Sequence, residues 1–370
     1  MKLVLKVSKI TNVVFSVFLA LYLLCGFFLL FAPANLKSIG ASLLLLSGVV
    51  ISLFVVWSDK ISITKYIMFI IYMCLFYILI QIINFRSPFS VLYPMCNLLI
   101  GYIVSVKKIN LSFLYIAFAV ISLVLLHFMI RGDNPNLIFE GSSRNLISVV
   151  MLFNSVLIYF QELKQQKTLS LFPAFFTCIF SVWAIGRSGI ICSIFLLLIV
   201  LYYQLKQQKI IYRILFALLL FVLFFFIIKT RLFEDLNMFE FFIRFEERGV
   251  TYDEDERKLM LDMYLAEMDV ASFLKGYNYF NDSRFLEWEY NVHNSLISCH
   301  ALWGVGTLFF FVYLVKKMLF MFKKDRFLFF LVIVFCVRIF SDAVCFNGIY
   351  DFIIISILFY SSIKMKYGKI

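Results

Sequence analysis

The chain has 370 residues, of which 63% are hydrophobic and 19% aromatic, and its mean hydropathy is +0.97. So few polar side chains cannot cover a water-soluble surface, and the composition therefore indicates an integral membrane protein. The net charge of +12 does not indicate nucleic-acid binding. The basic residues are concentrated in short segments between apolar runs, where they report how the chain is oriented in a bilayer.

Apolar runs close to twenty residues in length predict roughly twelve membrane-spanning helices. We therefore expect an all-α polytopic membrane protein in which residues 1–370 form a single transmembrane domain. The first run follows a basic start and precedes Ala32-Pro33-Ala34, as in a signal peptide. It is longer than a usual signal sequence and is interpreted as a retained first helix. The predicted spans, in chain order, are Ile10–Phe31, Ile39–Trp57, Tyr66–Ile83, Phe89–Val106, Leu111–Ile130, Leu146–Phe160, Leu171–Ile185, Ile190–Tyr203, Ile210–Ile228, His293–Val315, Phe327–Val344 and Phe352–Ile363.

The basic residues lie mostly on one side of these spans, which gives a predicted orientation. When the N-terminus is placed in the cytoplasm, most of the 34 lysines and arginines fall inside and the short outer loops hold few. Both termini are therefore predicted to be cytoplasmic. The segments predicted to be cytoplasmic contain Lys2, Lys6, Lys9, Lys60, Lys65, Lys107, Lys108, Lys164, Lys167, Lys206, Lys209, Arg213, the Lys316–Arg326 cluster, Lys364, Lys366 and Lys369.

One long polar loop, residues 229–292, lies between the predicted ninth and tenth spans and therefore on the outer, periplasmic side. Within it, Thr251-x-x-Glu254 has the form of a capping box, and apolar residues then recur at intervals of three and four. An amphipathic helix is expected from Tyr252 to Leu274, with Gly276 just past its end.

Three of the arginines predicted on the outer side are candidate site residues. Arg144 lies in a short loop, Arg187 in a Gly-Arg-Ser-Gly turn, and Arg257 in the first turns of the loop helix. Guanidinium groups are permanently charged and suit a diphosphate. Simpler interpretations exist, because Arg144 and Arg187 could anchor to lipid phosphate and Arg257 could pair with Asp253 four residues earlier. Their convergence on one face, which follows independently from the cytoplasmic lysines, favours a functional role.

His293 lies at the start of the tenth predicted span, where an imidazole can take a proton from a sugar hydroxyl or can simply cap the helix. Asn294 beside it could orient a sugar or the imidazole. The acidic run Asp253–Glu256 contains an Asp-x-Asp pattern, but a helix N-terminus accounts for it, and neither a metal nor another cofactor is predicted. Arg338 and Asp342, four residues apart in the eleventh span, are expected to neutralise each other.

Taken together, these motifs resemble the O-antigen polymerase and O-antigen ligase superfamily of bacterial surface-glycan assembly. The resemblance covers about residues 180–310 and rests on three motifs in the family's order. They are Gly186-Arg187-Ser188-Gly189, Arg257-x-x-x-Leu261 with the later Gly276, and His293-Asn294 followed by Gly304-Val305-Gly306-Thr307. The ligase form of the last motif ends Gly-x-x-Gly-Thr, one residue longer than in this chain, which favours a polymerase.

The resemblance implies a metal-independent glycosyltransferase with a polyprenyl-diphosphate-linked oligosaccharide donor and acceptor. It implies that Arg187 and Arg257 hold the diphosphate and that His293 lies near the acceptor hydroxyl, with Arg144 and Asn294 binding substrate. We therefore expect an O-antigen polymerase in the bacterial inner membrane, with membrane lipid and a chain-length regulator protein as candidate partners. The alternatives are an O-antigen ligase, which transfers finished polymer to a lipid core, and a flippase for lipid-linked glycan, a class that usually lacks one dominant outer loop.

Overall fold

The computed structural model describes residues 2–58, 64–139, 143–207, 249–288, 290, 292, 294–341 and 348–367. Within these ranges the chain forms α-helices joined by short loops and 3-10 turns, with no β-strand, so the predicted helical class is confirmed. The α-helices are α1 (Lys2–Phe28), α2 (Ala34–Ser58), α3 (Thr64–Ile83), α4 (Leu92–Val106), α5 (Leu111–Ile130), α6 (Asn145–Lys164), α7 (Phe172–Trp183), α8 (Arg187–Gln207), α12 (Gly249–Ala266), α13 (Val270–Lys275), α14 (Ser295–Trp303), α15 (Gly306–Lys324), α16 (Arg326–Ser341) and α17 (Phe352–Tyr367).

Seven helices of the described chain are long and apolar enough to cross a membrane. They are α1 to α6 and α8, with α4 counted together with the 3-10 turn Pro88–Val91. Helix α7 and most of α17 are apolar but shorter. The predicted ninth span, Ile210–Ile228, lies outside the described residues, so the count of twelve spans stays a prediction.

Helix α6 forms the centre of the bundle. Of its most apolar 18-residue window, 89% is buried, against 28% for the window in the peripheral helix α3. Helices α5, α7, α8, α16 and α17 all contact α6. A helix that is apolar on every side must be enclosed by other helices or by lipid. Its neighbours therefore fix the position of both ends of α6.

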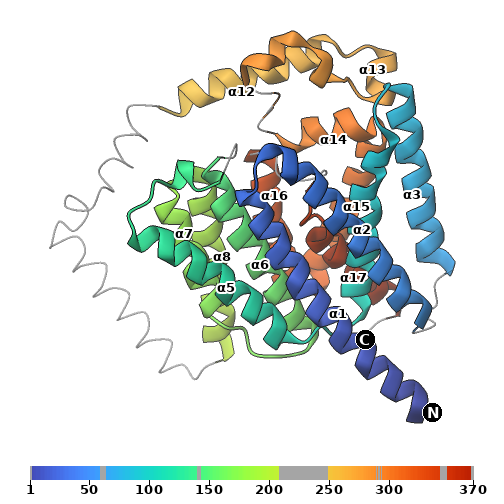
Figure 1. Cartoon of the computed structure of the whole chain (residues 1–370), viewed down its shortest axis with the longest axis vertical. Coiled ribbons are helices and arrows are strands. Elements are labelled where there is room, and N and C mark those ends of the chain that lie inside the picture. Colours follow the sequence, from blue (N-terminus) through green and yellow to red (C-terminus); the bar gives the residue numbers. More distant parts are fainter. Residues whose placement is uncertain are drawn as a thin grey trace.

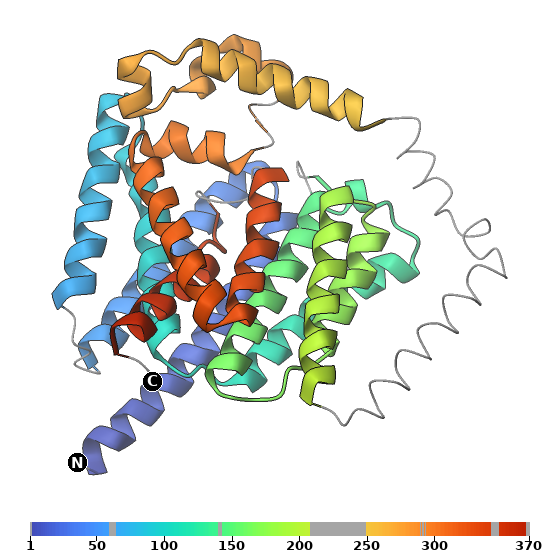
Figure 2. The ribbon, with the colours of Figure 1, turned by 180° about the vertical axis from the view of Figure 1, so that it is seen from behind.

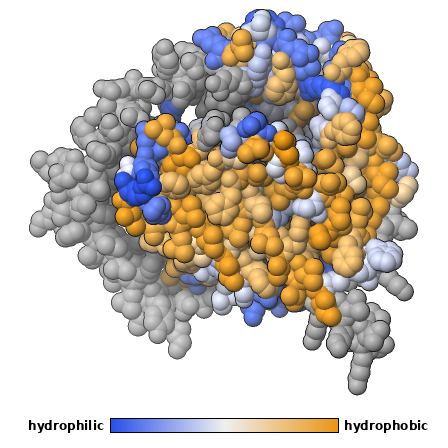
Figure 3. All heavy atoms as spheres, viewed as in Figure 1, coloured by the Kyte–Doolittle hydropathy of each residue, from blue (hydrophilic) through white to orange (hydrophobic). Residues whose placement is uncertain are grey.

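The outside of the bundle is strongly hydrophobic. Figure 3 shows apolar side chains covering the side of the molecule, with hydrophilic residues gathered over one end. Large side chains such as Leu43, Tyr72 and Leu123 are more than 60% exposed. An apolar surface this extensive is the signature of contact with lipid chains rather than water. The structure thus agrees with a membrane-embedded protein.

Three helices cover one end of the bundle. Helices α12 and α13 form the outermost layer, and α14 lies between them and the bundle (Figures 1 and 2). We call α12, α13 and α14 the cap, and the end of the bundle that they cover the capped end. The start of α1 and the end of α17 lie toward the opposite end. The cap is formed by part of the long loop together with the chain that follows it.

The last turn of α3 and the loop after it hold the cap in place. Gln81 donates a hydrogen bond to the carbonyl of Leu302 (2.7 Å), and Asn84 donates one to the carbonyl of Lys275 (2.6 Å). Arg86 donates to the carbonyl of Ala301 (2.9 Å). The final carbonyls of a helix have no partner within that helix, so these three side chains cap α13 and α14 and tie both to α3.

Two helices predicted to be continuous are broken. The expected helix Tyr252–Leu274 is wrong, because α12 ends at Ala266 and α13 begins after Asp269, whose carboxylate accepts from the Ser272 amide (2.6 Å). A short polar side chain that caps a new helix competes with continuation of the previous one. The predicted N-cap at Thr251 is also wrong, since Thr251 lies within α12, which is described from Gly249.

The expected single span from His293 to Val315 is wrong as well. It consists of α14 and α15, separated at Gly304, whose φ is +52°. The reason is a close crossing with the end of α13. A Cβ on Gly304 would lie 2.2 Å from the carbonyl oxygen of Leu274, and a Cβ on Gly276 (φ +81°) would lie 2.2 Å from that of His300. Only glycine allows both backbones to approach this closely.

We predict that Gly276→Ala lowers the free energy of unfolding by about 2–3 kcal/mol more than Gly132→Ala, because a backbone carbonyl must move to admit the methyl group. Gly132 is the matched control, since its φ is +74° but a Cβ there would meet nothing within 4 Å. The measurement is thermal unfolding of the purified proteins in the same detergent. Equal losses for the two variants would mean that backbone conformation alone, and not the crossing, requires Gly276.

Candidate functional site

The first turns of α6 and α8 pack directly against each other at the capped end (Figure 1). A Cβ on Gly186 would lie 2.7 Å from Oδ1 of Asn145, and a Cβ on Gly189 would lie 2.3 Å from Oγ of Ser148. The two glycines that flank Arg187 therefore have a packing role, since they let the start of α8 approach the start of α6. The Gly-Arg-Ser-Gly motif sets the separation between two helix starts.

Each of these two helix starts carries an arginine. Arg144 directly precedes α6, Arg187 is the first residue of α8, and both are half-buried. Helix N-termini carry a partial positive charge and usually attract acidic side chains. Neither α6 nor α8 has an acidic residue in its first turn. Two helix starts and two arginines thus lie at the same end of the bundle, an arrangement that suits an anion.

A third arginine contacts the same two helix starts. Arg338, in the last turn of α16, is fully buried, and its Nη1 donates to the hydroxyl of Ser188. Its Nη2 donates to the carbonyl of Asn145 (3.2 Å). The predicted partner Asp342 lies outside the described residues, so that pairing stays a prediction. One signal of this role was visible in the sequence, namely a charged residue within an apolar run. The partners of Arg338 could not be predicted from it.

The remaining predicted site residues belong to the cap. The backbone of Arg257 lies in α12, above the capped end, while its side chain and all of His293 lie outside the described part of the structure. Asn294 is half-buried, and its side-chain oxygen accepts from the Leu296 amide (2.8 Å), which makes it the N-cap of α14. The amide oxygen of Asn294 thus has a structural role, whatever its NH₂ group contacts.

The cap has a small hydrophobic core of its own, which keeps its helices in register. The buried residues are Met260, Tyr264, Tyr279, Phe285, Val292, Ile297 and Ala301. At its edge the Tyr264 hydroxyl lies 2.7 Å from Nδ1 of His300, and Nε2 of His300 lies 3.0 Å from the carbonyl oxygen of Phe273. A carbonyl can only accept, so Nε2 carries the proton and Nδ1 accepts from Tyr264. Burial lowers the pKa of His300, which favours this neutral form of the imidazole.

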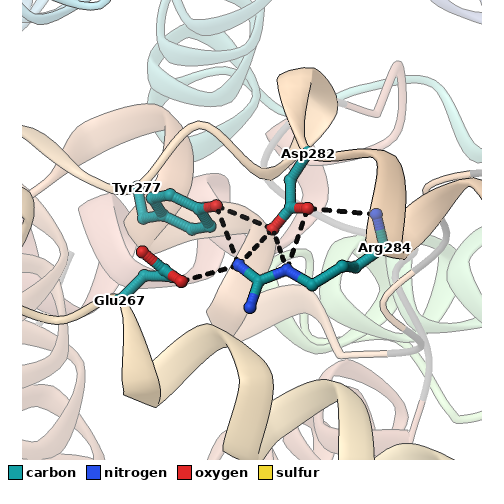
Figure 4. A network of polar contacts seen from close by, with 4 residues as sticks. All are labelled: Glu267, Tyr277, Asp282 and Arg284. Carbon is teal, nitrogen blue, oxygen red and sulfur yellow. Dashed lines mark hydrogen bonds and ion pairs between the residues drawn. The ribbon is translucent and has the colours of Figure 1, made fainter.

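An exposed ion network fastens the end of α12 to the chain that follows α13 (Figure 4). Arg284 contacts Asp282 (2.6 Å) and Glu267 (2.7 Å), and the Tyr277 hydroxyl donates to Asp282 (2.7 Å). The guanidinium of Arg284 lowers the pKa of Asp282 to about 2. Because Arg284 is matched by two carboxylates, it is not a candidate for binding an anionic ligand, and as an exposed pair the network adds little stability.

A cavity of about 300 Å³ lies between α3, α4, α14, α15 and α17. Its walls are mainly apolar, and two of its lining residues, Phe69 and Phe309, are also exposed on the lipid-facing side. Such walls suit a hydrocarbon chain rather than a sugar. Among the described residues no group of three or more His, Cys, Asp or Glu could hold a metal ion.

Comparison with protein-family models, with characterised proteins and with solved structures gives no match to this chain. The function must therefore be argued from the chemistry at the capped end. The candidate groups there are arginines, and they lie where apolar helices meet a polar cap. They are carried on helix starts whose separation is fixed by packing.

We predict that the stability of the cap falls as the pH drops below the ordinary histidine pKa of 6.5. The folded state lowers the pKa of His300, so its contribution is complete above 6.5 and is lost as the imidazole gains a second proton. The melting temperature of the wild type should drop more between about pH 7.5 and about pH 5.5 than that of His300→Gln, which cannot titrate. Tyr264→Phe removes the donor to Nδ1 and should therefore also show a smaller drop than the wild type. Equal slopes for wild type and His300→Gln would show that another group titrates.

Proposed function

We propose that this chain is an O-antigen polymerase, a glycosyltransferase that joins polyprenyl-diphosphate-linked oligosaccharide repeat units at the outer face of the bacterial inner membrane. The observation that carries the proposal is the packing of the starts of α6 and α8, which brings Arg144 and Arg187 to the same end of the bundle as α12. A lipid-linked diphosphate is an anion located at this depth, where a membrane meets a polar layer.

The reaction needs a group that stabilises a departing diphosphate. In the proposed mechanism, a hydroxyl oxygen of the acceptor repeat unit attacks the anomeric carbon of the donor glycan. The bond from that carbon to the diphosphate oxygen breaks, and the diphosphate leaves with the electron pair. Arg144, Arg187 and the amide groups of two helix starts neutralise the charge that develops there, and Arg257 adds to this from the cap. The hydroxyl proton passes to His293 and then to solvent.

The distribution of lysines supports an outward-facing cap. Lysines lie at helix ends opposite the cap: Lys107 follows α4, Lys164 ends α6, Lys324 ends α15 and Lys364 lies near the end of α17. Short loops rich in Lys and Arg remain in the cytoplasm. The capped end then faces away from the cytoplasm, where lipid-linked repeat units are presented after translocation. The apolar cavity between α3, α4 and α17 is a suitable place for part of a lipid chain.

We predict that Arg187→Gln lowers polymerisation by a factor of about 10²–10³, because one charge-assisted donor to the leaving group is lost. The change should leave the α6–α8 packing intact, because the contact between these helices is made at Gly186 and Gly189. Arg131→Gln is the matched control, since Arg131 is also an arginine at the capped end but is exposed and paired with Asp133 (3.5 Å). The measurement is the gel profile of surface glycan in a deletion strain complemented with each variant at equal protein level.

The same strain separates the proposal from its alternatives. Loss of a polymerase leaves single repeat units attached to the acceptor lipid, whereas loss of a ligase leaves none attached. Purified protein supplied with lipid-linked repeat units should elongate them without added energy, whereas translocation without elongation would identify a flippase. A normal ladder of long chains from Arg187→Gln would remove this arginine from the mechanism.

A further inference from the structure

Arg338 is the most deeply buried cation near the candidate site, and it contacts the residue that follows each of the two arginines already named. Its side chain is 0% exposed, so it does not face a ligand directly. Two of its hydrogen-bond partners, Ser188 and Asn145, directly follow Arg187 and Arg144 in the sequence. One guanidinium thus joins the residue after one candidate arginine to the residue after the other.

The side chain of Arg338 reaches two helix starts rather than the end of a helix. On its own helix Arg338 lies in the last turn, where the helix dipole favours a cation. Its side chain, however, reaches the first residues of α6 and α8, where the dipoles of both helices oppose a cation. Lys164 at the other end of α6 shows the usual arrangement: it donates to the carbonyls of Val104 (2.7 Å) and Lys107, at the C-terminal end of α4. Arg338 instead joins two helix starts that each carry a candidate site arginine, which ties its place in the fold to the candidate site.

We infer that Arg338 is a positioning residue, which sets the separation and orientation of Arg144 and Arg187 for a diphosphate group; this inference rests on the proposed function. The guanidinium is planar and presents its donors as a rigid fork. With one nitrogen on the Ser188 hydroxyl and another on the Asn145 carbonyl, it fixes the start of α8 relative to the start of α6. The glycines at 186 and 189 bring the helices close, and Arg338 determines where along that contact they are held.

The experiment measures binding of inorganic pyrophosphate to the purified full-length protein in lipid nanodiscs by calorimetry. The variants are Arg338→Lys, Arg187→Gln and the double variant. Lysine keeps the charge at 338 but cannot bridge both acceptors, so Arg338→Lys should raise the Kd roughly tenfold. If Arg338 acts through Arg187, the same change in the Arg187→Gln background should have little further effect, because coupled residues are not additive.

Lys164→Gln is the matched control, since it removes a cation that binds backbone carbonyls at the opposite end of α6. It should lower the melting temperature and leave the Kd for pyrophosphate unchanged. If Arg338→Lys fails to fold, Ser188→Ala replaces it, because it removes one of the two acceptors and leaves the charge in place. That variant should raise the Kd about threefold, again only when Arg187 is present.

The outcomes distinguish an error in the proposed anion site from an error in the role of Arg338. If the wild type does not bind pyrophosphate, or if Arg187→Gln binds it as well as the wild type does, the anion site itself is wrong and both the proposed function and the role of Arg338 are overturned. A second outcome is that Arg187→Gln weakens binding while Arg338→Lys leaves the Kd unchanged, as Lys164→Gln does, or raises it equally with and without Arg187. In either case only the positioning role is overturned. Coupled losses at 338 and 187 support it.

Discussion

The contact between the first turns of α6 and α8 is the constraint on which the candidate site depends. Helix α6 is enclosed by five other helices, so its start cannot move without repacking the bundle. The glycines at 186 and 189 then bring α8 so close that the side chains of Asn145 and Ser148 occupy the space where their own would be. Two arginines placed at helix starts on such a scaffold are held far more rigidly than arginines on a loop, which favours a site that must match a fixed anionic group.

The cap depends on a different kind of interaction. Helices α13 and α14 are short, and the carbonyls at their ends accept hydrogen bonds from Gln81 in the last turn of α3 and from Asn84 and Arg86 in the loop after it. These attachments lie on the α3 side, whereas α12 extends away from them over the rest of the capped end (Figure 1). The cap is thus anchored on a membrane helix at one side, and its own small core and the Arg284 network transmit that anchoring to α12. This links the placement of Arg257 to a helix more than 170 residues earlier in the chain.

The sequence was sufficient for the class of fold and for most helix positions, because a run of apolar residues is a local property that needs no partner to be recognised. It failed where the backbone is shaped by distant contacts. The break at Gly304 follows from a crossing with Leu274, and the N-cap at Asp269 ends a helix whose apolar periodicity continues past it. For the same reason Arg187 could be singled out from its motif, while the partners of Arg338 and the pairing of His300 with Tyr264 could not. Those depend on which helix ends meet, and periodicity does not contain that information.

Electrostatics connects these observations to the proposed reaction. A bilayer penalises buried charge, so arginines at 144, 187 and 338 around two helix starts are residues for which a function is to be sought. In the proposed reaction that function is to bind an anion, because the low dielectric that makes buried charge costly also makes the attraction of a cation for a diphosphate strong. The gain is largest as the sugar–phosphate bond breaks and the leaving group acquires its full charge. In the proposed reaction the arginines would therefore stabilise the leaving group most where the barrier is highest, and cations placed at helix starts are held more rigidly for this task than cations on loops.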